Sequence, residues 1–217
     1  VTQSDRLALY DAALKRLQAM GLAYPCFCTR ADIAREVAAS VSAPHGADGP
    51  LYPGTCRLLS VGERAERLAA AAPCWRLDAR AAQARTGPLS WHDDRAGAVA
   101  VDVTALGDIV LKGKAAPASY HLACVVDDAV LSVTDVVRGA DIFASTHAQV
   151  LLQAVLALPT PRYHHHPLVV DANGVRLAKR HDAPTLEMVR ASGADGRALA
   201  DQLRAGQLPI GFALLSG

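Results

Sequence analysis

The chain has 217 residues, of which 51% are hydrophobic and 20% charged, and its formal net charge is +1. This composition excludes an intrinsically disordered protein, because disordered chains are poor in apolar residues and rich in charge. No apolar run approaches the roughly 18 residues that a membrane-spanning helix needs, and the balanced charge gives no general attraction to nucleic acid or an anionic membrane. We therefore expect one folded domain, with or without an insertion, that does not enter a membrane.

The first 20 residues predict a helix. Ser4 or Asp5 is placed to cap it, and one face of the segment is apolar at helical spacing, with Leu7, Tyr10, Leu14 and Leu17. The chain opens on Val1 and shows neither a signal sequence nor a transit peptide. We therefore expect a cytoplasmic protein. The missing initial Met fits either the downstream part of a longer protein or a processed or alternative start.

Five cysteines are present, an odd number that argues against a disulfide framework. Cys74 and Cys124 lie in apolar segments and are interpreted as small buried side chains. The other three, Cys26, Cys28 and Cys56, form a C-x-C pair and a distant partner on either side of a loop rich in small residues. Thiolates bind zinc well, so this pattern predicts a closed structural zinc site.

The fourth ligand of that site is left open by the residues alone. His45 is a common ligand by type, whereas Tyr52 is an unusual one that stands four residues before Cys56.

The elements that follow predict a compact α+β insertion over residues 21–115, which contains the zinc loop. We expect a helix over 29–39 capped by Thr29, and a second helix over 61–71. Strand-like pieces over 74–77, 98–103 and 108–111 are separated by glycine-containing turns.

The second half predicts an α/β fold, a parallel sheet covered by helices. An apolar run over 120–128 precedes a β-branched segment over 133–139 that we interpret as a buried strand. A helix over 145–158 and a strand over 166–170 follow, and Asn173-Gly174 signals a hairpin turn before the basic loop 176–181. Two helices, over 185–192 and 195–205, close the chain. The run His164–His166 alternates between faces, so we do not expect it to hold one metal.

Six short motifs occur in an order that resembles the class I glutamyl-tRNA synthetase family. They are Cys26-Phe27-Cys28, Tyr52-Pro53-Gly54-Thr55-Cys56, Tyr120-His121-Leu122-Ala123, Val125-Val126-Asp127-Asp128, Val137-Arg138-Gly139-Ala140-Asp141 and the loop 176–180. Only 38 residues follow Lys179, too few for the anticodon-binding region of the full-length enzymes. The chain is therefore more similar to the short glutamyl-Q tRNA(Asp) synthetases, which lack that region.

This resemblance implies the second half of a Rossmann-like catalytic core with a zinc-containing insertion of the acceptor-binding type. The expected boundaries are 1–20 for a helix from the first part of the core, 21–115 for the insertion, 116–184 for the second half and its lysine loop, and 185–217 for the C-terminal helices. The implied activity is activation of glutamate by ATP with magnesium, and transfer to the queuosine base of tRNA(Asp). The partners would be glutamate, ATP and tRNA(Asp), and we expect a monomer.

The resemblance also assigns roles to residues. Cys26, Cys28, Tyr52 and Cys56 match the structural zinc ligands, which favours Tyr52 over His45. The glutamate-binding residues would be Tyr120 and Arg138, and a planar guanidinium at the end of a strand suits a carboxylate. Without the resemblance, Tyr120 is equally a core aromatic, and Arg138 a structural partner of Asp135 or Asp141.

The catalytic loop of the family corresponds to residues 176–180. Lys179 matches its second lysine, which binds ATP and stabilises the charge that builds on the phosphates as pyrophosphate leaves. Arg176 replaces the first lysine and keeps its charge, Ala178 replaces a serine, and Arg180 replaces the last residue. The alternative interpretation of residues 176–181 is a solvated basic turn.

The H-I-G-H-type motif of class I synthetases is absent from this sequence. Two hypotheses follow: a truncated piece of an active enzyme, or a catalytically inactive zinc-containing fragment that binds RNA or regulates. A third is a zinc-containing structural domain without any link to RNA. We expect these 217 residues alone to show negligible glutamate-dependent ATP–pyrophosphate exchange.

Overall fold

The computed structural model describes residues 2–39, 45–46, 49–171, 173–177, 185–209 and 212–215. Two compact units are present: residues 1–137 with 142–164, and residues 138–141 with 165–217. In the part of the chain that is described, no helix is long and apolar enough to cross a membrane.

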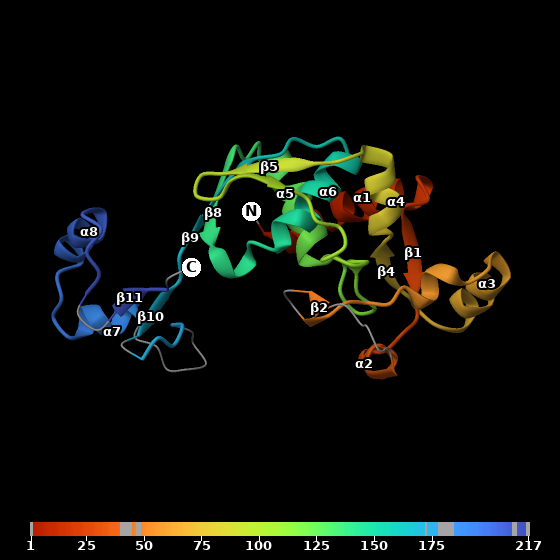
Figure 1. Ribbon diagram of the computed structural model, residues 1–217, viewed down its shortest axis with the longest axis horizontal. Helices are drawn as coiled ribbons and strands as arrows, with labels where there is room; N and C mark the ends of the chain where they lie inside the picture. The colour runs from red at the N-terminus through yellow and green to blue at the C-terminus, as the bar shows by residue number, and fades with distance from the viewer. Residues whose placement is uncertain are drawn as a thin grey trace. The chain divides into compact units, whose positions relative to one another are not determined.

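The first unit is built from helices that enclose an apolar core. Its helices are α1 (Leu7–Ala19), α2 (Arg30–Ala39), α3 (Val61–Ala70), α4 (Ala79–Thr86), α5 (Tyr120–Val130) and α6 (Ser145–Val155). Helix α5 packs on α1 and α6, and α4 packs on α6 (Figure 1). The fully buried side chains of Leu17, Leu77, Leu111, Leu151 and Leu152 fill the space between these helices and the neighbouring sheet.

That neighbouring sheet has three antiparallel strands in the order β1-β4-β7, formed by Ala23–Cys26, Cys74–Leu77 and Val110–Lys112. The side chains on its two faces belong to different hydrophobic clusters. Ala23, Trp75 and Leu77 belong to the helical core, whereas Tyr24, Cys26 and Cys74 belong to a second, smaller cluster with Tyr52 and Cys56. Side-chain alternation along the strands therefore directs one face toward the cysteines.

The other large sheet is mixed and has the strand order β6-β5-β9-β8. Its strands are β5 (Ser90–Asp93), β6 (Gly97–Ala100), β8 (Asp135–Gly139) and β9 (Arg162–His166). Strands β5 and β6 form an antiparallel hairpin, and β5 pairs with β9 in parallel through Asp93 and Tyr163. The parallel arrangement that the sequence predicts is therefore combined with an antiparallel hairpin.

The second unit contains β10 (Val169–Asp171), α7 (Leu186–Ala191), α8 (Gly196–Arg204) and β11 (Phe212–Leu214), and β10 pairs antiparallel with β11. The predicted turn at Asn173-Gly174 is confirmed, since the Gly174 N–H donates to the Asp171 carbonyl and Gly174 has a φ of +75°. Both closing helices are confirmed, with Thr185 and Asp195 as their N-caps.

The remaining described elements are short. They are η1 (Gln3–Arg6), η2 (Thr55–Leu58), η3 (Ala140–Ile142), β2 (His45–Gly46) and β3 (Gly49–Pro50).

Several local expectations are wrong. The strand expected over 166–170 is interrupted between β9 and β10, and Cys74 and Cys124 are only partly buried. Neither Ser4 nor Asp5 caps α1, because both lie in η1 and the N-cap position is occupied by Arg6 without a side-chain cap in this described segment. The segment over 133–139 forms β8, yet it is not buried: Val137 is 69% exposed. Its place at the end of the strand order explains this, since an edge strand is covered less completely than a central one.

Candidate functional site

Three cysteine side chains converge beside the end of β1. Cys26 and Cys28 are separated by one residue, so both side chains project to the same side of an extended segment. Cys56 comes from η2, and the Sγ atoms of all three lie within 4.8 Å of one another. The sulfurs of Cys28 and Cys56 are 3.5 Å apart, and the Phe27 N–H donates to the Cys56 sulfur at 3.4 Å. Such spacing is suited to a single metal ion.

Tyr52 adds an oxygen to this group. Its hydroxyl oxygen lies 3.6 Å from the Cys28 sulfur and accepts the Cys56 N–H at 2.8 Å. The structure therefore brings together all four residues that the resemblance assigns to zinc. Of the alternative ligand His45, only the backbone is described, in β2. Three sulfurs and one phenolic oxygen supply four donors, the number that a closed tetrahedral zinc site needs.

Burial and hydrogen bonds together shift the pKa values of these donors. Desolvation raises the pKa of Cys28 to about 12 and also raises the pKa of Tyr52. For Cys56, burial acts in the same direction, but hydrogen bonds from the Phe27 N–H and the Tyr52 hydroxyl outweigh it and lower the pKa. A bound cation would favour the deprotonated forms, so the donor set fits a group that binds with release of protons.

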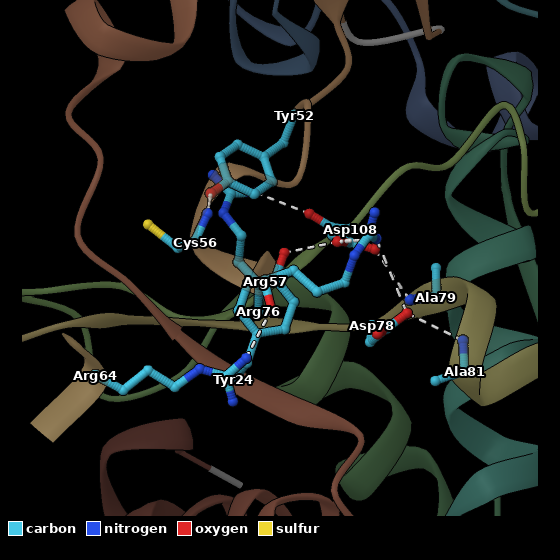
Figure 2. A network of polar contacts seen from close by, with 10 residues as sticks. All are labelled: Tyr24, Tyr52, Cys56, Arg57, Arg64, Arg76, Asp78, Ala79, Ala81 and Asp108. Atoms are coloured by element: carbon cyan, nitrogen blue, oxygen red, sulfur yellow. Dashed lines mark hydrogen bonds and ion pairs between the residues drawn. The ribbon is translucent and has the colours of Figure 1, made fainter. Parts of the chain in front are cut away.

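Tyr52 and Cys56 belong to a network of polar contacts with the neighbouring sheet and helix α4 (Figure 2). At its centre is Asp108, whose side chain is 3% exposed. Its carboxylate accepts from the Tyr24 hydroxyl at 2.6 Å, from Arg57 Nη1 at 2.7 Å and from the Ala79 N–H at 3.1 Å. Because Arg57 follows Cys56 directly, the ion pair ties the cysteine segment to the sheet.

Arg76 connects the network to the tyrosine. Its guanidinium lies 4.0 Å from the centroid of the Tyr52 ring, and its Nη1 donates to the Asp108 carbonyl oxygen at 2.8 Å. The sequence pattern alone does not point to Asp108, Arg57 or Arg76. The available signal was weak. Arg76 is a charged residue inside a strand, Arg57 stands beside a candidate ligand, and Asp108 is an acid just before a strand.

The two residues that the resemblance assigns to glutamate binding, Tyr120 and Arg138, have different surroundings. Tyr120 is the first residue of α5 and its side chain is half-exposed. Arg138 lies on β8, and its Nε donates to His165 Nε2 at 2.9 Å. Because arginine Nε is always a donor, the buried His165 accepts through Nε2 and is held in one orientation.

The basic loop is described only at its start. Arg176 Nη2 donates to the Asp141 carboxylate at 2.5 Å, and Asp141 lies just after β8. Lys179, Ala178 and Arg180 lie outside the described residues.

The histidines at 164–166 have different neighbours, as their alternation predicts. His164 lies 3.5 Å from Asp94, His165 accepts from Arg138, and His166 contacts the Pro167 carbonyl.

The arrangement as a whole is that of a class I aminoacyl-tRNA synthetase catalytic fold. A solved glutamate tRNA ligase from Elizabethkingia meningosepticum, in complex with its amino acid, superposes with a TM-score of 0.66 at 24% identity. The match covers 82% of this chain and 36% of that one. The family model of tRNA synthetases class I (E and Q), catalytic domain, matches residues 1–207, and the chain belongs to this family.

Curated relatives in the family carry the name glutamyl-Q tRNA(Asp) synthetase. The protein from Rhodobacter capsulatus is 44% identical over 88% of this chain and 70% of its own length. The protein from Symbiobacterium thermophilum is 43% identical over 88% of this chain and 57% of its own length. That from Leptothrix cholodnii is 41% identical over 99% of this chain and 68% of its own length. The chain thus spans 57% to 70% of the length of these relatives.

Proposed function

We propose that the protein containing this chain activates glutamate with ATP and transfers it to the queuosine base of tRNA(Asp). The observation that carries the proposal is the similarity to the named relatives, which extends over most of the described fold. The family membership independently supports ligase chemistry on glutamate or glutamine.

Arg138 is proposed to bind a carboxylate of glutamate. Its planar fork matches a carboxylate, and the bond from Nε to the buried His165 fixes the plane of that fork before substrate arrives. The hydroxyl of Tyr120 is proposed as a second contact with the amino acid.

Adenylate formation joins the glutamate α-carboxylate to the α-phosphate of ATP and expels pyrophosphate. We assign Lys179 and Arg176 to the charge that builds on the leaving phosphates. Magnesium would neutralise part of the same charge. Since Arg176 is paired with Asp141, it must exchange this carboxylate for phosphate oxygens when ATP binds.

The whole gene product that contains these residues provides the test. Radiolabelled glutamate, ATP and tRNA(Asp) with or without queuosine are combined, and the tRNA is then cleaved to separate the anticodon stem from the 3′ end. We expect label in the anticodon fragment, and only with queuosine. Label at the 3′ end, or label independent of queuosine, would contradict the proposed acceptor. RNA binding without any transfer would instead support an inactive RNA-binding fragment.

A pair of variants tests the arginine. Arg138→Lys keeps the charge but removes the fork, so we expect the KM for glutamate to rise by about tenfold or more with little change for ATP. Arg162→Lys is the matched control, because Arg162 lies on the surface of β9 and pairs with Asp94.

We further propose that Cys26, Cys28, Cys56 and Tyr52 hold a structural zinc ion. The donor set and its compact geometry support this. Metal analysis of protein purified without chelator should find about one equivalent, and less than about 0.2 equivalents would count against the site. Cys28→Ser should lose the metal, whereas Cys124→Ser, on α5, should retain it.

A further inference from the structure

A fourth thiol lies beside the three converging cysteines. Cys26 and Cys74 are directly opposite each other in the antiparallel β1–β4 pair, at the last position of its register. Opposed residues project to the same face with their Cβ atoms about 4.5–5.5 Å apart. Cys74 indeed packs against the cluster of Tyr24, Cys26, Tyr52 and Cys56. Two thiols on one face of the sheet, Cys26 and Cys74, therefore lie beside two from the neighbouring segments, Cys28 and Cys56.

These four thiols divide into two pairs. The first is Cys28 with Cys56, whose sulfurs are 3.5 Å apart. The second is Cys26 with Cys74, whose opposition in the register is compatible with the Cα separation of about 4.4–6.8 Å that a disulfide requires. Each pair combines one buried thiol, Cys56 or Cys26, with one that is partly exposed, Cys28 or Cys74. An oxidant can thus reach one member of each pair, and the other is in place to react with it.

We propose that the metal-free site is oxidised by peroxide to two disulfides, Cys28–Cys56 and Cys26–Cys74, and that Cys74 fixes this pairing by engaging Cys26. The inference rests on the proposed metal site only in that the metal must first leave. Peroxide oxidises the exposed thiol of a pair to a sulfenic acid and releases one water. The buried thiol then attacks that sulfur, the S–S bond forms, and a second water leaves. Forming each disulfide consumes one peroxide, which takes two electrons from the pair of thiols.

Cys74 supplies the even number that this chemistry needs. In a three-thiol site, the buried Cys26 and Cys56 would compete for the sulfenic acid of Cys28, because the three sulfurs lie within 4.8 Å of one another. With Cys74 opposite, Cys26 is held in a disulfide of its own, and Cys28 pairs with Cys56 alone. A dithiol can reopen both disulfides, after which the site can take up metal again.

The test uses the whole chain, first stripped of metal by a chelator and checked by metal analysis. Hydrogen peroxide is added, remaining thiols are alkylated, and the peptides are mapped by mass spectrometry. We expect both named disulfides, with Cys124 alkylated. A Cys26–Cys28 or Cys26–Cys56 disulfide, or alkylated Cys74 beside a sulfinic acid on Cys26, would overturn the proposal. The metal content before stripping separately tests the zinc proposal, so the two failures are distinguishable.

Reversal provides the second measurement. After oxidation and reduction with dithiothreitol, the parent and Cys124→Ser should regain metal to within about twofold of the untreated protein. The oxidised Cys74→Ser variant, mapped in the same way, should give a mixture of Cys28–Cys56 and Cys26–Cys28 disulfides, because Cys26 has lost its own partner. A Cys28–Cys56 disulfide alone in Cys74→Ser, as in Cys124→Ser, would contradict the role of Cys74. Should Cys74→Ser fail to fold, the disulfide map of the parent still decides the pairing.

Discussion

The guanidinium of Arg76 lies 4.0 Å from the centroid of the Tyr52 ring, while its Nη1 is bound to the carbonyl oxygen of Asp108. A cation placed over an aromatic face contributes about 0.5–2 kcal/mol, more when both partners are desolvated. Arg76 is buried, so this contact fixes the ring and thereby the position of its hydroxyl beside the sulfurs. The arginine thus acts on the candidate metal centre without touching the metal.

Replacing Arg76 with methionine should therefore weaken metal retention. Outer-shell partners typically change metal affinity by about 10–100-fold, and we expect about tenfold for Arg76→Met. Competition with a chromophoric chelator measures this directly. The control is Arg80→Met, because Arg80 is exposed on α4. Equal affinities for the two variants would show that the stacking contact does not position the ligand.

The carboxylate of Asp108 should matter for stability more than for metal specificity. In Asp108→Ala, the Tyr24 hydroxyl, the Ala79 N–H and Arg57 all lose an acceptor at a buried position. Breaking such a pair costs about 3 kcal/mol, which urea unfolding can measure. Asp201→Ala, which removes an exposed ion pair with Arg204, should cost less than about 1 kcal/mol. A loss of similar size in both variants would mean that Asp108 is not the centre of the network.

The end of α6 offers a stabilising change. Ala157 has a φ of +51° and is exposed, and the Leu158 N–H that follows it donates to the Gln153 carbonyl. Glycine adopts this conformation without the cost of a Cβ, so Ala157→Gly should stabilise the protein by about 0.5–1 kcal/mol. Ala154→Gly, one turn earlier in the same helix, should destabilise it by about 1 kcal/mol. Thermal unfolding of the two variants should therefore shift in opposite directions.

Features that depend on neighbouring residues could be predicted from the sequence, and those that depend on strand order could not. Thr29 sits three residues from the backbone N–H that it caps, so a local pattern revealed α2. The four candidate ligands were found through ordered motifs. By contrast, Arg57 and Asp108 are 51 residues apart, and only the β1-β4-β7 register brings their segments together. The same reason explains the error over β8, because the edge position of a strand is a property of the sheet.

Acid should destabilise the first unit in part through His147. Its Nδ1 accepts the Asp102 N–H, and its ring packs edge-on against Trp91. Burial lowers the pKa of His147 below its ordinary value of 6.5, although Asp102 acts in the opposite direction. Below pH 6.5, His147 binds a proton in the unfolded chain but remains neutral in the folded chain until the pH falls to its lowered pKa. The free energy of unfolding therefore falls as the pH drops from 6.5 through the pKa of the folded state.

Urea unfolding at several pH values between 7.5 and 5 tests this expectation. His147→Phe should show a smaller loss of stability over that range than the parent, whatever its stability at neutral pH. His166→Phe, at an exposed position on β9, should follow the parent. A pH dependence that is unchanged in His147→Phe would assign the acid sensitivity to other groups.

Gly139 leaves room for the Asp141 carboxylate that binds Arg176. A Cβ at this position would collide with Asp141 Oδ1 and would lie 3.0 Å from Leu168 Cδ2. Asp141 is the carboxylate that binds Arg176, so Gly139→Ala should displace it and weaken that ion pair. Hydrogen exchange should become faster around residues 168–177. The free energy of unfolding should fall by about 1–3 kcal/mol, as is typical of overpacking. Gly196→Ala is the matched control, because a Cβ there meets nothing within 4 Å and alanine suits the first position of α8. If both variants exchange like the parent, Asp141 must have room to move, and the ion pair does not depend on the missing side chain of Gly139.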